Sequence, residues 1–287
     1  MNQALNQMLS RYVCETENDY VNAIREILQE IALLGLWRGK FFEHAAFYGG
    51  TALRILYGLN RGSEDLDFSL LKPTGEFRLS EYENALKREL AGFGFQVDFS
   101  VKEKTSDSQI DSAFLKANTK MLFIAIGLPE QLTDQIHSRK ELKIKLEIDI
   151  DPPPDFQTEI KTLLRPFPHT VRVYSLPDLL AGKLHAVLFR KWKNRSKGRD
   201  WYDLVWYAGN HPRVNLRHLE QRMRQSKDYT LLEPLTATEL HSMLKQAVDR
   251  IDIDQLKADV RPFIRDPQEL ELWSPDFFRD VVAQITV

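Results

Sequence analysis

The sequence contains a single cysteine, Cys14, among 287 residues. One cysteine excludes an internal disulfide and the cysteine-rich ligand sets of structural zinc sites. Long apolar runs are also missing, since no stretch approaches the roughly 18 uninterrupted apolar residues of a membrane-spanning helix. The N-terminal segment lacks a basic region followed by an apolar one. We therefore expect a soluble, unexported protein of the cytoplasm that has no membrane partner.

The chain also has almost no net charge, because 39 Lys and Arg residues oppose 41 Asp and Glu residues. An anionic partner must then be bound by a local basic patch. Hydrophobic residues make up 43% of the chain and charged residues 28%, a composition typical of globular proteins and not of disordered ones. The length exceeds the roughly 100–200 residues of one domain, so we expect two.

Periodicity divides the chain into two parts. Before about residue 170, amphipathic helical segments are interspersed with strand candidates at 45–48, 65–70, 95–104, 120–128 and 141–151. After residue 175 the periodic segments are helical, at 175–192, 199–209, 215–225, 236–251 and 274–285. We predict an α+β fold, with a mixed sheet flanked by helices over 1–170, a mainly helical domain over 171–287, and the segment 165–175 as connector.

Chemistry-bearing residues are concentrated in "YGGTALRILYGLNRGSEDLDFSL", residues 48–70. Gly49 and Gly50 precede a helical segment, whose unpaired backbone N–H groups would form an anion-binding turn, and Thr51 would add a hydroxyl. Asp65 and Asp67 lie two residues apart on a strand candidate and therefore on one face. A cation between these carboxylates would remove their repulsion, and oxygen ligands favour Mg²⁺ or Mn²⁺. The alternatives are a tight glycine turn and a solvated strand face.

A third carboxylate is available on the strand candidate at 141–151. Asp149 shares a face with Glu147 and Asp151, and would approach Asp65 and Asp67 if the two strands are neighbours. Two-metal phosphoryl transfer needs such a shared cluster. Without that adjacency, these acids are the exposed face of an edge strand.

Four blocks in order resemble the AbiEii/AbiGii toxin family of nucleotidyltransferases, whose core is similar to that of DNA polymerase β. The blocks are "GGTALRILYGLNRGSEDLDFSL", "KLEIDIDPP", "AGKLHAVLFR" and "KGRDWYDL", and they extend over more than half of the chain. The resemblance implies triphosphate binding by Gly49, Gly50 and Thr51, nucleotide contacts by Arg61 and Ser63, metal binding by Asp65, Asp67 and either Asp149 or Glu147, phosphate contact by Lys183, and a final motif acid at Asp200 or, as the second choice, Asp203.

The residues themselves support the last two assignments independently. Lys183 lies among leucines on a helical segment, so its stem is packed while its ammonium must reach an anion or solvent. Asp200 and Asp203 follow a basic stretch, but acids at a helix N-terminus that interact with the helix dipole have the same pattern. Both interpretations stay open from the sequence.

A basic segment, "RKWKNRSKGR", joins the Lys183 and Asp200 motifs. It has six basic residues, no acidic residue and one tryptophan. Clustered cations with an aromatic ring can neutralise a phosphate backbone and stack a base, which favours a single-stranded or looped RNA end. The candidate nucleic-acid contacts are Arg190, Lys191, Trp192, Lys193, Arg195, Lys197 and Arg199; a solvated loop is the alternative.

We therefore predict a Mg²⁺- or Mn²⁺-dependent nucleotidyltransferase that uses a nucleoside triphosphate. The resemblance implies a toxin with a separately encoded antitoxin, acting on RNA and most simply on the 3′ end of tRNA. A metal-dependent nuclease is an alternative, because Lys145 and Glu147 resemble the lysine and acid of such enzymes. A non-catalytic nucleic-acid- or partner-binding module on a transferase scaffold is another.

Overall fold

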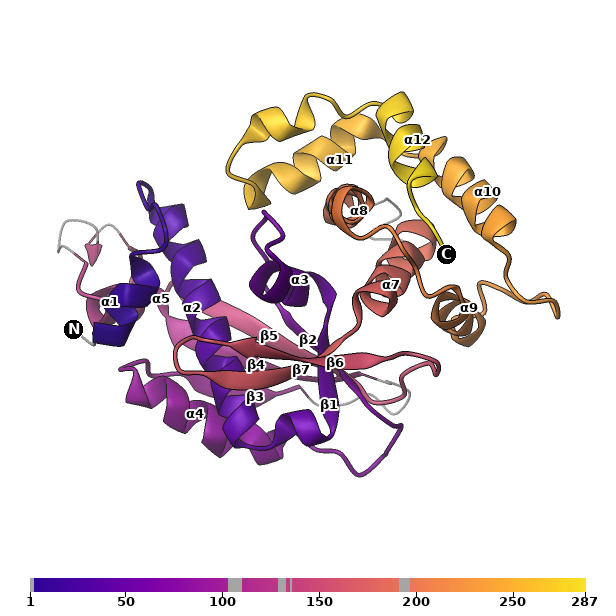
Figure 1. Ribbon diagram of the computed structural model, residues 1–287. Helices are drawn as coiled ribbons and strands as arrows, with labels where there is room; N and C mark the ends of the chain where they lie inside the picture. Colours follow the sequence, from indigo (N-terminus) through magenta and orange to yellow (C-terminus); the bar gives the residue numbers. More distant parts are fainter. Residues whose placement is uncertain (1–2, 103–109, 129–132, 135, 191–196) are drawn as a thin grey trace. The chain divides into compact units, whose positions relative to one another are not determined.

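A computed structural model describes residues 3–102, 110–128, 133–134, 136–190 and 197–287. The chain forms two compact units, each assembled from separate segments (Figure 1). Unit 1 comprises residues 1–56, 63–152 and 160–173, and unit 2 comprises residues 57–62, 153–159 and 174–287. The short segment 57–62 lies in the sequence between the glycines at 49–50 and the aspartates at 65 and 67, and it belongs to unit 2.

A seven-stranded mixed sheet forms the centre of unit 1. Its strands are β1 (Ala45–Tyr48), β2 (Leu66–Leu70), β3 (Asp98–Val101), β4 (Ile110–Asn118), β5 (Glu141–Asp149), β6 (Thr158–Leu163) and β7 (His169–Tyr174). Their order is β3-β4-β5-β2-β1-β7-β6. The pairs β1–β2, β3–β4 and β4–β5 are antiparallel, whereas β2–β5 and β1–β7 are parallel. The predicted α+β fold with a mixed sheet is confirmed.

Unit 1 contains helices in addition to this sheet. They are α1 (Gln3–Leu9), α2 (Glu17–Arg38), α3 (Gly49–Tyr57), α4 (Glu83–Gly92) and α5 (Thr119–Ala125), with 3₁₀ turns at Phe41–Glu43 and Leu79–Tyr82. The long helix α2 begins with a capping box in which Thr16 and Asp19 satisfy each other's backbone N–H groups. Gly35 lies within this helix; a Cβ there would lie 3.2 Å from the Leu86 Cα, so glycine allows α4 to pack closely.

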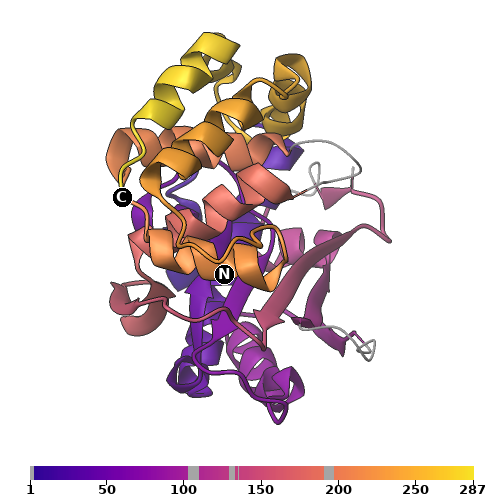
Figure 2. The same cartoon turned by 90° about the vertical axis from the view of Figure 1, so that its right-hand side faces the viewer.

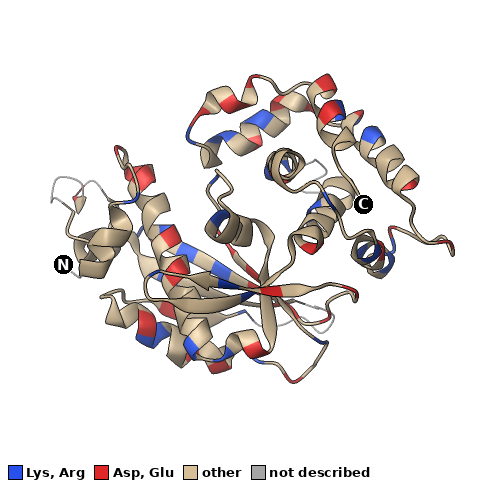
Figure 3. Cartoon of the chain, viewed as in Figure 1, with Lys and Arg blue, Asp and Glu red and all other residues tan. Residues whose placement is uncertain are grey.

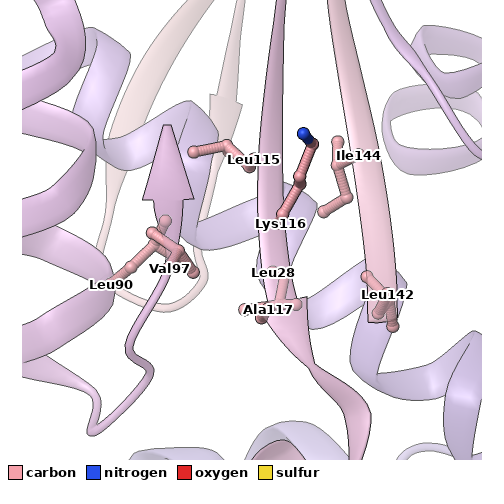
Figure 4. Close-up of a pocket in the computed structure, with 8 residues that line it drawn as sticks. All are labelled: Leu28, Leu90, Val97, Leu115, Lys116, Ala117, Leu142 and Ile144. Atoms are coloured by element: carbon pink, nitrogen blue, oxygen red, sulfur yellow. The ribbon is translucent and has the colours of Figure 1, made fainter. Parts of the chain in front are cut away.

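The alternation predicted for β5 is observed. Its buried side chains are Leu142, Ile144, Leu146 and Ile148, and the intervening positions carry charged residues. On the buried face, Leu28 of α2 and Leu90 of α4 meet residues of β4 and β5 around a small apolar pocket (Figure 4). The charged residues of β5 project from the opposite face, which leaves that face for chemistry.

Two local predictions are wrong. The segment 120–128 was expected to be a strand, but α5 occupies it, because the Asn118 side chain caps the helix by accepting from the Met121 N–H. A short apolar run has no period that distinguishes a strand from a buried helix. The segment 165–175 was expected to be only a connector, yet it contains β7, whose Val173 is paired with Phe47 of β1. Strands β4 and β6 were not predicted.

Unit 2 is mainly helical beyond residue 175, as expected (Figure 2). Its helices are α7 (Leu176–Phe189), α8 (Gly198–Asn210), α9 (Leu216–Gln225), α10 (Ala237–Val248), α11 (Ile253–Val260) and α12 (Pro275–Ala283), with 3₁₀ turns at Arg261–Phe263 and Pro267–Leu270. Asn215, Thr236 and Ser274 cap three of them with side-chain oxygens. No helix in the described ranges is long and apolar enough to cross a membrane.

Helix α8 is the central helix of unit 2. Trp201 is buried on it and meets Phe278 of α12 edge to face, with ring centroids 5.1 Å apart. At its first residue, Gly198, a Cβ would lie 2.2 Å from the backbone oxygen of Leu256, so only glycine permits this approach to α11. The buried position of α8 fixes the acids near its N-terminus, Asp200 and Asp203.

Candidate functional site

The glycine turn lies against Asp67, one of the two aspartates of the pair, within unit 1. Tyr48, the last residue of β1, is opposite Asp67 in the antiparallel β1–β2 pair, and Gly49 follows at once with a φ of +83°. A Cβ on Gly49 would lie 2.7 Å from Oδ2 of Asp67. Glycine is therefore required twice, for its backbone conformation and for the space that the carboxylate occupies. The N-terminus of α3 begins beside the Asp67 carboxylate.

Thr51 supports the loop that precedes β2. Its side chain is 0% exposed, and its hydroxyl donates to the backbone oxygen of Asp65 and lies 2.7 Å from the Ser63 hydroxyl. This differs from the expectation that Thr51 offers its hydroxyl to an anion, because the hydroxyl is buried and used within the protein. The anion binding predicted for the turn would then depend on its backbone N–H groups.

Strands β2 and β5 are neighbours, so the adjacency on which the third carboxylate depended is confirmed. In their parallel register Asp67 is opposite Glu147, and Ser69 is opposite Asp149. Opposite residues of paired strands project from the same face. Glu147 accepts from Lys145, whereas Asp149 accepts from the backbone N–H of Asp151 at 3.1 Å and so stabilises the turn after β5. The register favours Glu147 as the β5 acid beside Asp67.

These residues fit a hard divalent cation in their donor chemistry. Asp65, Asp67 and Glu147 offer only oxygen ligands, which Mg²⁺ and Mn²⁺ prefer. Within the described residues, no group of three or more His, Cys, Asp or Glu side chains is arranged as a complete metal site. Mg²⁺ usually binds through one or two carboxylates and completes its coordination with water and substrate phosphates. A carboxylate touching an anion-binding turn suits a cation that is bound together with a triphosphate.

Unit 2 contains a second cluster, made of Arg61, Lys183, Asp200 and Asp203. The Arg61 guanidinium forms a fork on Asp203, with Nε 2.6 Å from Oδ1 and Nη2 2.7 Å from Oδ2. The Lys183 ammonium lies 2.7 Å from Asp203 Oδ2 and 2.7 Å from Asp200 Oδ1. The Lys183 side chain is only 11% exposed, and the other three are buried more deeply. Two cations and two carboxylates thus neutralise one another away from water.

The carboxyl groups of this cluster are held ionised. Burial alone raises the pKa of Asp203, but the Arg61 and Lys183 charges outweigh burial and keep this pKa below its ordinary value. The pKa of Asp200 is lowered in the same way, with Lys183 and Arg190 opposing burial. For Arg61 the directions are reversed. Burial alone lowers its pKa, but the charge and hydrogen bonds of Asp203 more than offset burial, so Arg61 stays charged.

Asp200 and Asp203 differ in how many of their carboxylate oxygens already accept hydrogen bonds. Both oxygens of Asp203 accept hydrogen bonds from cations of the cluster. Oδ2 of Asp200 is buried and, in the described part of the chain, has no hydrogen-bond partner; Arg190 Nη1 approaches it only to 3.7 Å. Asp200 therefore has a carboxylate oxygen without a hydrogen bond among the described residues, whereas both oxygens of Asp203 are engaged.

The predicted nucleic-acid segment is only partly described. Lys191, Trp192, Lys193 and Arg195 lie outside the described residues. Arg190 is exposed beside Asp200, Lys197 is half-buried, and the Arg199 guanidinium lies 4.0 Å from the centre of the Phe263 ring. Basic and acidic positions are interspersed along the helices of both units (Figure 3).

Sequence reasoning missed Gln29 and Arg25 on α2. Gln29 is 1% exposed and donates to the backbone oxygens of Ser63 at 3.2 Å and Glu64 at 3.0 Å. Arg25, one turn earlier, interacts electrostatically with Glu64 and Asp65. One signal was available: Gln29 interrupts the apolar run of a helix, and a buried polar side chain needs a partner.

The family of the chain follows from comparison with known proteins. The family model described as "Nucleotidyl transferase AbiEii toxin, Type IV TA system" matches residues 31–282. The chain belongs to the AbiEii family. It is therefore a nucleotidyltransferase of a type IV toxin–antitoxin system, as the four sequence blocks predicted. This assignment favours transfer over the nuclease and the non-catalytic module.

Solved structures agree with the AbiEii fold. A proposed nucleotidyltransferase from Helicobacter pylori is 20% identical with a TM-score of 0.54, and the match covers 94% of this chain and 95% of that one. JHP933 from Helicobacter pylori is also 20% identical, with a TM-score of 0.55 and coverage of 94% and 92%. No curated protein sequence matches the chain significantly. The family implies a nucleoside triphosphate as substrate and an antitoxin as partner.

Proposed function

We propose that this toxin transfers a nucleotide from a nucleoside triphosphate to a hydroxyl of RNA, with Mg²⁺ or Mn²⁺ bound by Asp65, Asp67 and Glu147. One observation supports it above the others: Gly49, at the start of α3, lies against Oδ2 of Asp67. Phosphate oxygens bound at the helix N-terminus would thus be beside the carboxylate. Triphosphate and cation need that proximity, since each neutralises the other.

Each residue of unit 1 has a distinct role in this proposal. Backbone N–H groups at Gly50 and the next residues of α3 bind phosphate oxygens. Asp65 and Asp67 orient the cation, and Glu147 or, as the second choice, Asp149 completes the carboxylate set. Bound Mg²⁺ would supply charge neutralisation and polarise the attacking hydroxyl. Thr51 and Ser63 act through the loop, because their hydroxyls bond within the protein.

In unit 2, Lys183 is the proposed phosphate contact. An ammonium has three N–H donors, and Asp200 and Asp203 accept two of them. The third remains for a phosphate oxygen. Asp200, which has an unused oxygen, is the proposed final motif acid. Arg61 is buried in its fork on Asp203 and supports Lys183 instead of contacting the nucleotide.

The acceptor is the finer part of the proposal. The basic segment 190–199 supports an RNA end as acceptor, and the 3′ end of tRNA offers a free hydroxyl on a single-stranded tail. The exposed Arg190 is a contact to the phosphate backbone of RNA in this proposal. A separately encoded antitoxin would oppose this activity.

Labelled transfer tests the function directly. Each of the four labelled nucleoside triphosphates is incubated with purified tRNA, total RNA or protein, with Mg²⁺ and with a chelator. We expect label in tRNA, an increase in product length, and loss of both in the chelator and in Asp67→Asn. Glu141→Gln, an exposed acid at the far end of β5, is the control that keeps activity. Shortened RNA, or label that persists in Asp67→Asn, would contradict the proposal.

A further inference from the structure

Three consecutive backbone carbonyls before β2 are held by buried side chains of two helices. Gln29 of α2 donates to the oxygens of Ser63 and Glu64, and Thr51 of α3 donates to the oxygen of Asp65. Both donors are almost fully buried. Asp65 lies in this loop and not in β2 itself, whose hydrogen bonds begin at Leu66. Its position therefore depends on these side-chain bonds, whereas the sheet fixes Asp67.

The Gln29 carboxamide is buried among apolar side chains of α2. It stands in a helix whose neighbouring residues Leu28 and Ile31 belong to the apolar core. Burying an amide costs free energy unless it forms hydrogen bonds, and here the side-chain nitrogen bonds two adjacent carbonyls. The same bonds satisfy two backbone carbonyls of an irregular segment, where no helix or strand provides a hydrogen-bond donor for them.

Arg25 adds a charge on the same side of α2. It lies one turn before Gln29, and its charge interacts with Glu64 and Asp65. Its Nη1 is held by the Asn22 side chain at 2.8 Å, and its Nε is buried without a hydrogen-bond partner within the described part of the chain. Helix α2 thus contributes the Gln29 amide as a hydrogen-bond donor and the Arg25 guanidinium as a cation to the loop of Asp65.

We propose that Gln29 is a positioning residue that sets the Asp65 carboxylate for metal binding. The inference rests on the proposed function and extends it to a residue outside the segment that defines the family, since the family model matches from residue 31. The side chains that bind a metal must be held to within about 0.5 Å of their productive geometry, and the residues that support them provide this precision. Losing such support costs roughly 10–100-fold in metal affinity or activity.

Three variants test the inference. Gln29→Met keeps the volume and removes the donor; Gln29→Glu keeps the shape but turns an acceptor toward two carbonyls. Glu30→Gln is the matched control, because Glu30 is the next buried polar residue of α2 and its partner is Arg11, away from the loop. The measurements are Mn²⁺ affinity by calorimetry, kcat and KM in labelled transfer, amide exchange over residues 63–67, and thermal unfolding.

We expect Gln29→Met to weaken Mn²⁺ binding and lower kcat by roughly 10–100-fold, with a much smaller change in KM for the nucleotide and with faster exchange at 63–67. Gln29→Glu should be more severe at neutral pH. Glu30→Gln should lose thermal stability and keep wild-type Mn²⁺ affinity and kcat. A merely structural role of Gln29 would make its variants behave like this control.

The possible outcomes distinguish a failure of the Gln29 inference from a failure of the proposed transferase function. Wild-type Mn²⁺ affinity and kcat in either folded Gln29 variant overturn the inference while the transferase function stands. If the wild-type protein itself neither binds Mn²⁺ nor transfers label, the proposed function fails and the metal-positioning role of Gln29 fails with it, even if amide exchange at 63–67 shows that Gln29 holds the loop. Unchanged exchange there in a folded variant overturns the inference under either result.

Discussion

Asp67 of β2 and Glu147 of β5 are directly opposite each other across a parallel strand pair. Asp149 is opposite Ser69, one step further along, and caps the turn that follows β5. The register therefore places Glu147, and not Asp149, opposite Asp67, and which of the two acids binds the metal stays a prediction.

Glu147→Gln should lower kcat of nucleotide transfer by about 100-fold, because it removes a charged oxygen ligand beside Asp67. Asp149→Asn should lower it by less than about 10-fold, since the amide oxygen still accepts from the Asp151 N–H. Steady-state kinetics at saturating Mg²⁺ compare the two. The reverse ranking would assign the third carboxylate to Asp149.

Gly49→Ala should abolish most of the transfer activity. An L-residue at a φ of +83° costs roughly 1–2 kcal/mol, and the new methyl group would collide with the Asp67 carboxylate. Gly94→Ala is the control, with a φ of +88° and nothing within 4 Å of its Cβ. Chemical denaturation should show destabilisation in both variants, and labelled transfer should show loss of activity in Gly49→Ala alone. Equal activities would remove the glycine turn from the site.

Asp203→Asn should destabilise the protein by about 3–5 kcal/mol at neutral pH, because it breaks a buried ion pair and leaves Arg61 and Lys183 undercompensated. Asp276→Asn, in an exposed pair, should change stability by less than about 1 kcal/mol. Urea denaturation at neutral pH measures both. Equal, small effects would show that the cluster does not support unit 2.

The pH dependence of stability has a definite sign. The folded-state pKa values of Asp200 and Asp203 are below the ordinary value of about 3.9 in an unfolded chain. Their contribution is therefore complete above that value and is lost as the pH falls through about 4 and below, when the unfolded state binds more protons. Unfolding followed from pH 7 to pH 3 should show this loss in wild type and a shallower one in Asp203→Asn. Stability that rises on acidification would contradict it.

Gly198→Ala should destabilise unit 2 by at least about 2 kcal/mol, since its Cβ would overlap the backbone of α11 and backbone atoms cannot yield cheaply. Gly209→Ala, near the other end of α8 with nothing within 4 Å, should be neutral or stabilising by about 0.5–1 kcal/mol. Thermal unfolding of the two variants gives the comparison. Similar melting temperatures would mean that α11 shifts without cost.

Local patterns predicted the elements whose period is strong. The alternation of β5 and the helices after residue 175 follow from side-chain periodicity and from caps such as Thr236 and Ser274. Period alone could not identify α5, because an apolar run suits a buried helix as well as a strand. Strand β7 was hidden by the prolines at its start, which suggested a connector.

The candidate site was predictable where chemistry is encoded within a few residues, as in Gly49-Gly50 and Asp65/Asp67. The contacts of Gln29 with the loop join residues 34 and 35 positions apart. Arg61 and Asp203 are separated by 142 positions. Spacing within a motif holds no information about such pairs, so the fork of Arg61 on Asp203 could not be predicted from the sequence.

The membership of residues 57–62 in unit 2 has a consequence for how the chain can be divided and synthesised. A fragment that begins at Tyr174 would contain Lys183, Asp200 and Asp203 but would lack the Arg61 guanidinium that forms the fork on the buried Asp203. On the ribosome, Arg61 emerges 142 residues before its partner Asp203, so this ion pair can form only after most of the chain has been made. A C-terminal fragment made without residues 57–62 should therefore be less stable than the same residues within the full chain.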